Sequence, residues 1–95
     1  MSKTVIIINE ECHGFIGVAK NMREAFKFLL DFNWINGKTE IFEPHSNDEF
    51  TYLDDIREEL DYDNLLDTLL FLWNCDESYF EGQFYFSEEN VYGNN

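Results

Sequence analysis

The segment Thr4–Asn9, with the sequence TVIIIN, decides the fold. It is rich in β-branched residues and apolar on both alternating faces, which is typical of a central strand covered on both sides or flanked by neighbours. A polar segment follows and ends at Gly14, and Phe15–Ala19 is strand-like again. We therefore predict a hairpin that places Thr4–Asn9 at the centre of a sheet.

The middle of the chain predicts one helix and one further strand. Asn21 can cap a helix that begins at Met22, because apolar residues recur there at the spacing of one helical face. The helix should end before Asn36, at a turn-forming Asn-Gly pair. Thr39–Phe42 then reads as a third strand, and the polar loop over 44–50 is expected to be mobile.

The last part of the chain predicts two helices and a final strand. Thr51 with Asp54 resembles a capping box before a short amphipathic helix, and Asp63 can cap a second, mostly apolar helix that should lie in the core. Residues 79–87 alternate as a strand does, and the tail after Tyr92 should fray. The element order is β-β-α-β-α-α-β, an α+β fold with a small sheet of about four strands and helices packed against it.

Length and composition indicate one folded domain over residues 1–95. Aromatic residues make up 18% of the 95 residues, which is too much apolar surface for a disordered acidic chain. The apolar run Val5–Ile8 is too short for a signal peptide or a membrane span, so we expect a cytoplasmic protein. Cys12 and Cys75 are expected to be reduced thiols.

Charge is distributed unevenly along the chain. The net charge is −14, yet residues 1–39 carry five cations against four carboxylates, and residues 40–95 carry sixteen carboxylates against the single cation Arg57. Such a field favours a basic partner and disfavours direct binding to nucleic acid, because carboxylates repel phosphates. The small basic cluster Lys20, Arg23 and Lys27 does not reverse this expectation. Solubility is the alternative explanation for the acidity.

The second predicted helix concentrates the acidic residues. Side chains three and four residues apart on a helix lie about 5–6 Å apart, a charge spacing of the same order as that of phosphates on a nucleic-acid strand. We predict a partner-binding surface here, which imitates nucleic acid. The alternative is an ordinary solvated helix face. The predicted residues are Asp54, Asp55, Glu58, Glu59, Asp61 and Asp63.

Outward residues of the final predicted strand extend this surface. Tyr79, Glu81 and Tyr85 alternate with inward phenylalanines, and tyrosine is a residue type that anchors interfaces. Ordinary cross-strand packing is the alternative role for these aromatic side chains. An exposed edge strand could also form a homodimer by sheet extension.

Metal and catalytic sites are not indicated by the sequence. The possible zinc ligands Cys12, His13, His45 and Cys75 lack CxxC or HxxxH spacing, and no calcium-loop pattern occurs. Cys12 beside His13 lacks the surroundings of a nucleophile and base, because consecutive side chains in a turn rarely share a hydrogen bond. We expect no enzyme activity, no metal and no cofactor.

One segment resembles proteins of known origin. Val5–Trp34, with HGFIGVA followed by a short helix ending in FLLDFNWI, resembles small acidic proteins encoded by phages and mobile elements of Gram-positive bacteria. The resemblance covers about a third of the chain. Those proteins include anti-CRISPR inhibitors that present carboxylates to nucleic-acid-binding grooves, so the resemblance implies an inhibitor in a bacterial host cell. It assigns no functional residues.

The leading hypothesis is therefore a non-enzymatic acidic protein that inhibits a basic nucleic-acid-binding host protein, such as a CRISPR effector. The alternative hypothesis is a structural or regulatory accessory protein that forms a homodimer and is acidic for solubility.

Overall fold

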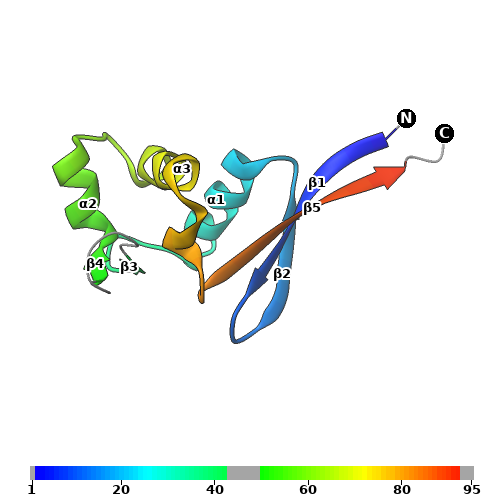
Figure 1. The fold of residues 1–95 in the computed structure, drawn as a ribbon, viewed down its shortest axis with the longest axis horizontal. Coiled ribbons are helices and arrows are strands. Elements are labelled where there is room, and N and C mark those ends of the chain that lie inside the picture. The colour runs from blue at the N-terminus through cyan, green and yellow to red at the C-terminus, as the bar shows by residue number, and fades with distance from the viewer. Residues whose placement is uncertain (1, 43–49, 93–95) are drawn as a thin grey trace.

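The computed structural model describes residues 2–42 and 50–92, which form an α+β fold (Figure 1). This confirms the predicted fold class, with five strands in the described residues divided between two sheets. The predicted loop over 44–50 lies, except for Phe50, outside the described residues, as does the tail after Tyr92. The elements are β1 (Ser2–Glu10), β2 (Gly14–Ala19), α1 (Met22–Asp31), β3 (Glu40–Phe42), β4 (Phe50–Tyr52), α2 (Leu53–Leu60), α3 (Leu65–Cys75), the 3₁₀ turn η1 (Glu77–Phe80) and β5 (Phe84–Tyr92).

The larger sheet is antiparallel with the strand order β2-β1-β5, so β1 is its central strand as predicted. Ile8 pairs with Gly17 on one side and with Phe86 on the other. Ile6 and Ile8 are buried, which places this face of β1 against the helices. The β1–β2 ladder shifts register between Ile8 and Asn9, at a β-bulge. Beyond β2, β1 and β5 continue as a two-stranded ribbon that runs away from the helices (Figure 1).

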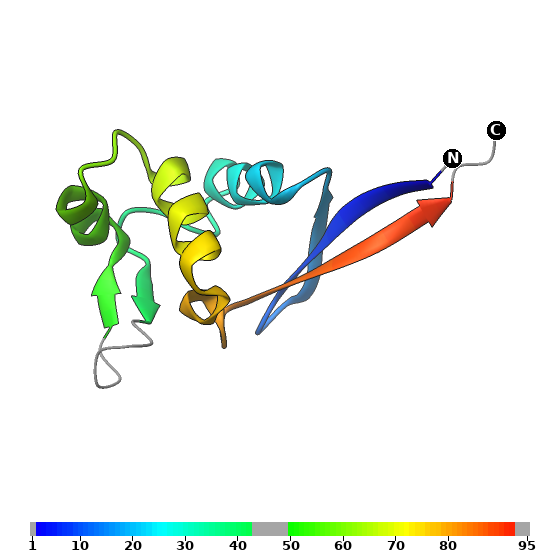
Figure 2. The same cartoon turned by 45° about the horizontal axis from the view of Figure 1, so that its top comes forward.

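The smaller sheet pairs β3 with β4, and sequence reasoning missed β4. Figure 2 shows this pair on the far side of α3 from the larger sheet. Thr51 pairs with Ile41 in β4 and lies one residue before the N-cap of α2, so the predicted capping box does not form. Tyr52 occupies the N-cap position without a side-chain hydrogen bond.

Asparagine side chains cap the two longer helices. Asn21 Oδ1 accepts the backbone N–H of Glu24 at 2.9 Å, which confirms the predicted start of α1. The cap of α3 is Asn64 instead of the predicted Asp63, because Asn64 Oδ1 accepts the N–H of Asp67 at 2.9 Å. The helix therefore begins one residue later than the predicted cap implies.

The predicted strand over 79–87 is wrong in its first half. Asp76 Oδ1 accepts the N–H of Ser78, and the chain forms the turn η1 there. Gly82 follows with φ = 81°, a left-handed conformation that glycine adopts without strain, and β5 begins only at Phe84. A local side-chain hydrogen bond therefore overrides the alternating pattern.

One apolar core joins the helices to both sheets. Phe26 of α1 lies at its centre, with ring centroids 5.1 Å from Phe80 and 5.3 Å from Phe86. The core residues are Ile6, Ile8, Ala25, Phe26, Leu29, Ile35, Ile41, Leu53, Ile56, Leu69, Leu72, Phe80 and Phe84. The predicted core helix α3 contributes Leu69 and Leu72 to it, whereas Phe71 remains exposed.

Candidate functional site

The carboxylates of α2 share the outward face of the helix. Leu53 and Ile56 are buried and orient α2, and each further residue advances by about 100° around the axis. Glu58 therefore falls opposite the buried side, Asp54 and Asp55 fall on either side of Glu58, and Glu59 lies at the margin that also lines a groove with Ile56. These residues, Asp54, Asp55, Glu58 and Glu59, define the acidic face of α2. The structure thus brings together the four predicted residues that belong to this helix.

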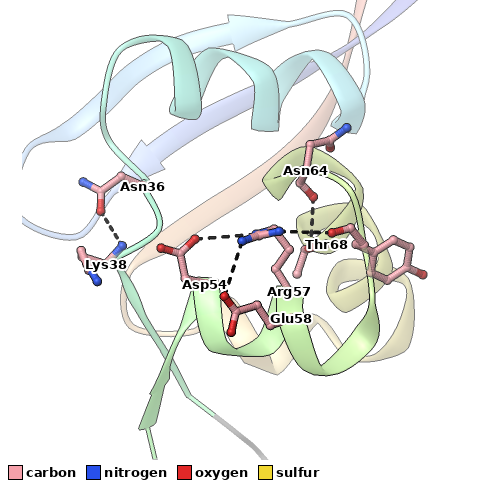
Figure 3. Close-up of polar contacts among 8 residues, drawn as sticks. Asn36, Lys38, Asp54, Arg57, Glu58, Asn64 and Thr68 are labelled. Carbon is pink, nitrogen blue, oxygen red and sulfur yellow. Dashed lines mark hydrogen bonds and ion pairs between the residues drawn. The ribbon is translucent and has the colours of Figure 1, made fainter.

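Arg57 lies beside Asp54 and Glu58 of the acidic face (Figure 3). Its Nε is 3.7 Å from Asp54 Oδ1, and its Nη2 is 4.0 Å from Glu58 Oε1. Within residues 2–42 and 50–92, it is the one cation within ion-pair distance of any of the four carboxylates, and Arg23 and Lys27 of α1 do not neutralise them. Glu58 keeps 72% of its side chain exposed, so its charge remains available to a partner.

Asp54 is the most constrained carboxylate of the acidic face. Its backbone N–H donates to Gly37 O at 3.0 Å, and its side chain lies where a Cβ on residue 37 would stand. The turn that carries Gly37 is closed by Asn36 Oδ1, which accepts the N–H of Lys38 at 2.8 Å (Figure 3). Asp54 therefore fastens α2 to this turn, and Asp55, Glu58 and Glu59 form the freer part of the face.

Two predicted acidic residues follow α2. Asp61 is the C-cap in a left-handed conformation with φ = 61°, and its N–H donates to Glu58 O at 3.2 Å. Asp63 is exposed in the connection to α3. Both residues are exposed and follow the C-terminal end of the helix.

Tyr79 lines a groove that is also lined by Glu59 of the acidic face. The groove holds about 220 Å³ and is formed by α2, α3 and η1. Its lining residues are Ile56, Glu59, Leu60, Phe71, Leu72 and Tyr79. Leu60 of α2 and Phe71 of α3 are exposed apolar residues in this groove that the sequence analysis did not identify. The exposure of Phe71 could have been expected, because a helix that is apolar on nearly all sides must expose part of its surface.

Glu81 and Tyr85 lie apart from this groove. They line a second hollow of about 170 Å³ together with Glu77 and Trp73. Because η1 interrupts the predicted strand, Tyr79 does not share a strand face with Tyr85. The predicted surface is thus divided into the acidic face with the Tyr79 groove and a separate region around Glu81.

The loop between β1 and β2 holds a polar cluster. His13 Nδ1 donates to Glu10 Oε1 at 2.5 Å, and the same oxygen accepts the backbone N–H groups of Cys12 and His13. The His13 hydrogen bond, with help from the two backbone donors, lowers the pKa of Glu10 below its ordinary value, although desolvation opposes the shift. The His13 ring also meets Trp34 edge-on, with centroids 5.1 Å apart. The contacts that His13 makes here are therefore with Glu10 and Trp34.

Residues 2–42 and 50–92 contain no group of three side chains that could hold a metal ion, and His45 lies outside that part of the chain. None of the helices in the same ranges is long and apolar enough to span a bilayer. No family model, no curated protein and no solved structure matches the chain. Functional inference therefore rests on the geometry of the site.

Proposed function

We propose that this protein is a non-enzymatic inhibitor that occupies the nucleic-acid groove of a basic protein with the acidic face of α2. The observation that carries the proposal is the placement of Asp55, Glu58 and Glu59 on one outward face, where Arg57 is the one cation of the described residues within ion-pair distance. Carboxylates held on a helix at fixed spacing present a row of negative charge, as a nucleic-acid backbone does.

Long-range electrostatic attraction accelerates the first encounter between the two proteins. A net charge of −14 attracts a basic groove over a distance set by the ionic strength, and this raises the association rate. The binding reaction should therefore weaken as salt is added, as it does for nucleic acid itself.

The groove beside Glu59 supplies short-range contacts. Tyr79, Phe71 and Leu60 offer apolar and aromatic surface next to the carboxylates. Aromatic anchors of this kind slow dissociation, whereas charges at a rim mainly affect association. The proposed interface therefore combines an acidic helix with one aromatic groove.

A CRISPR effector is the proposed partner. Such effectors hold a guide–target heteroduplex in a positively charged channel and recognise it by its backbone. An acidic helix can compete for that channel without reading sequence. The resemblance of Val5–Trp34 to phage-encoded acidic proteins favours this partner among basic nucleic-acid-binding proteins.

A displacement assay tests the proposal. Fluorescently labelled target DNA is bound to a purified, guide-loaded effector, and its anisotropy is followed as this protein is added. The wild-type protein should release the DNA, and the variant Asp55→Lys/Glu58→Lys/Glu59→Lys should lose at least tenfold in potency. The matched control is Glu88→Lys/Glu89→Lys with Glu81→Lys, which makes the same change in net charge away from α2.

The control separates a specific surface from bulk charge. If the reversals on β5 and Glu81 cost as much potency as those on α2, total charge and not the acidic face governs binding. If the wild-type protein displaces no DNA from any effector type, the proposed function is wrong.

A further inference from the structure

The outer edge of β2 is an unpaired strand edge without charged residues. Among the strands of residues 2–42 and 50–92, the order is β2-β1-β5, and β2 pairs only with β1. Its sequence GFIGVA over residues 14–19 contains no charge and no proline, two of the devices that protect an edge from pairing with another strand, and only the bulge at Ile16 interrupts it. The free backbone N–H and C=O groups of the β2 edge need hydrogen-bond partners, and another β-strand supplies them.

The opposite edge of the sheet is protected by charge. β5 carries Glu88 and Glu89 in succession, and both are exposed. Antiparallel pairing of β5 with its own copy would bring carboxylates close together, which is destabilising. β2 is therefore the edge at which two copies of a chain with a net charge of −14 can approach.

The side chains of Phe28 in α1 and of Phe32, its C-cap residue, extend the apolar surface beside β2. A Cβ on Gly17 would stand 2.9 Å from Phe28 Cζ, so glycine is what allows the Phe28 ring to lie against the strand. Phe28 in turn packs on Phe32 with ring centroids 4.9 Å apart. Phe32 is 68% exposed, Phe15 is 63% exposed and Val18 is 51% exposed, which are high values for apolar residues.

Charges around this edge are balanced, unlike those of the rest of the molecule. A hollow of about 390 Å³ lies between β2 and α1, and it is lined by Lys20 and Lys27 as well as by Glu24 and Asp31. Two cations with two carboxylates neither attract a strongly basic partner nor repel an acidic one. Such a mixture is self-complementary, because each sign can face the other across a two-fold axis.

We propose that two copies of this chain form a symmetric dimer by antiparallel pairing of β2 with β2. The two sheets then join into one of six strands, with both α1 helices on the same face beside the seam. Phe32 becomes buried on that face, and Val18, which pairs with Ile7, becomes buried on the opposite face. Figures 1 and 2 show α2 far from β2, with α1 and α3 between them. The dimer therefore leaves both acidic faces exposed.

Sedimentation and hydrogen exchange test the dimer. The wild-type protein should sediment at twice the mass of the chain and dissociate on dilution, and Val18→Glu or Phe32→Glu should shift it to the monomer. Tyr85→Glu is the matched control, since Tyr85 is also 51% exposed but lies on the other edge strand, and it should leave the dimer intact. Raising the salt concentration should strengthen the dimer by screening repulsion between two acidic chains.

Amide hydrogen exchange gives a readout without substitutions. Amides in residues 14–19 should exchange more slowly at concentrations where the dimer forms, whereas those of β5 should not change. A wild-type monomer at all concentrations overturns the proposal, as does an intact dimer in the Val18→Glu variant. Dissociation by Tyr85→Glu to the same extent also overturns it, because that result indicates face-to-face packing. None of these results bears on DNA displacement by α2, so the two proposals stand or fall separately.

Discussion

Arg57 and Asp54 form an ion pair within α2, with Arg57 Nε 3.7 Å from Asp54 Oδ1 (Figure 3). Arg57 Nη1 also donates to the carbonyl oxygen of Tyr62 at 3.4 Å, beyond the end of the helix. Arg57 thus links Asp54, at the start of α2, to Tyr62, which follows the helix. Arg57 therefore serves the fold, whereas its positive charge opposes the proposed binding.

Replacing Arg57 should affect stability and binding in opposite directions. Arg57→Gln removes a partly exposed ion pair and a hydrogen bond, and we expect a loss of about 0.5–1.5 kcal/mol in the free energy of unfolding. The same variant leaves Asp54 and Glu58 without a cation and should bind the basic partner more tightly. Urea denaturation and the displacement assay measure the two effects. Arg23→Gln, an exposed change of equal charge on α1, should leave stability nearly unchanged.

The cap of α3 can be tested by a pair of adjacent substitutions. Asn64→Ala removes the acceptor for the N–H of Asp67 and should cost about 1 kcal/mol. Asp63→Ala should cost little, since Asp63 is exposed and lies outside the cap. Thermal unfolding followed by circular dichroism distinguishes them, with an expected loss of about 4–8 °C for Asn64→Ala alone. A loss for Asp63→Ala that equals or exceeds that for Asn64→Ala would contradict the assignment of Asn64 as the cap.

The β1–β2 loop should contribute a pH-dependent part of the stability. The hydrogen bond from His13 lowers the pKa of Glu10 in the folded protein, so the folded state favours the ionised carboxylate. This contribution is fully present above the ordinary pKa of about 4.5 and is lost as the pH falls through the lowered value. Wild type should therefore exceed Glu10→Gln in unfolding free energy at neutral pH, and the difference should narrow below pH 4.5. A difference that is constant with pH would contradict this assignment.

Sequence patterns predicted the elements that depend on local periodicity. TVIIIN marked the central strand, and Asn21 marked the start of α1, because β-branched runs and side-chain caps act within a few residues. The pairing of Thr51 with Ile41 and the turn closed by Asp76 were missed. The first depends on residues ten apart along the chain, and the second on a local hydrogen bond that competes with an alternating pattern.

In the candidate site, too, the features set by local geometry were predictable and those set by packing between elements were not. The acidic face of α2 was predictable, because helical geometry alone sets the relative directions of Asp55, Glu58 and Glu59. The position of Tyr79 beside Glu59 was not, because it depends on how α2, α3 and η1 pack. The same packing separates Tyr85 from that surface.

The dependence of the association rate on salt tests the central claim most directly. Glu58→Gln removes one charge from the acidic face without changing its shape, and Glu88→Gln removes one charge from β5. Stopped-flow association with the guide-loaded effector should slow steeply for wild type as salt rises. The slope should be shallower for Glu58→Gln and unchanged for Glu88→Gln. A rate that is independent of salt, or equal slopes for the two variants, would contradict binding through the acidic face of α2.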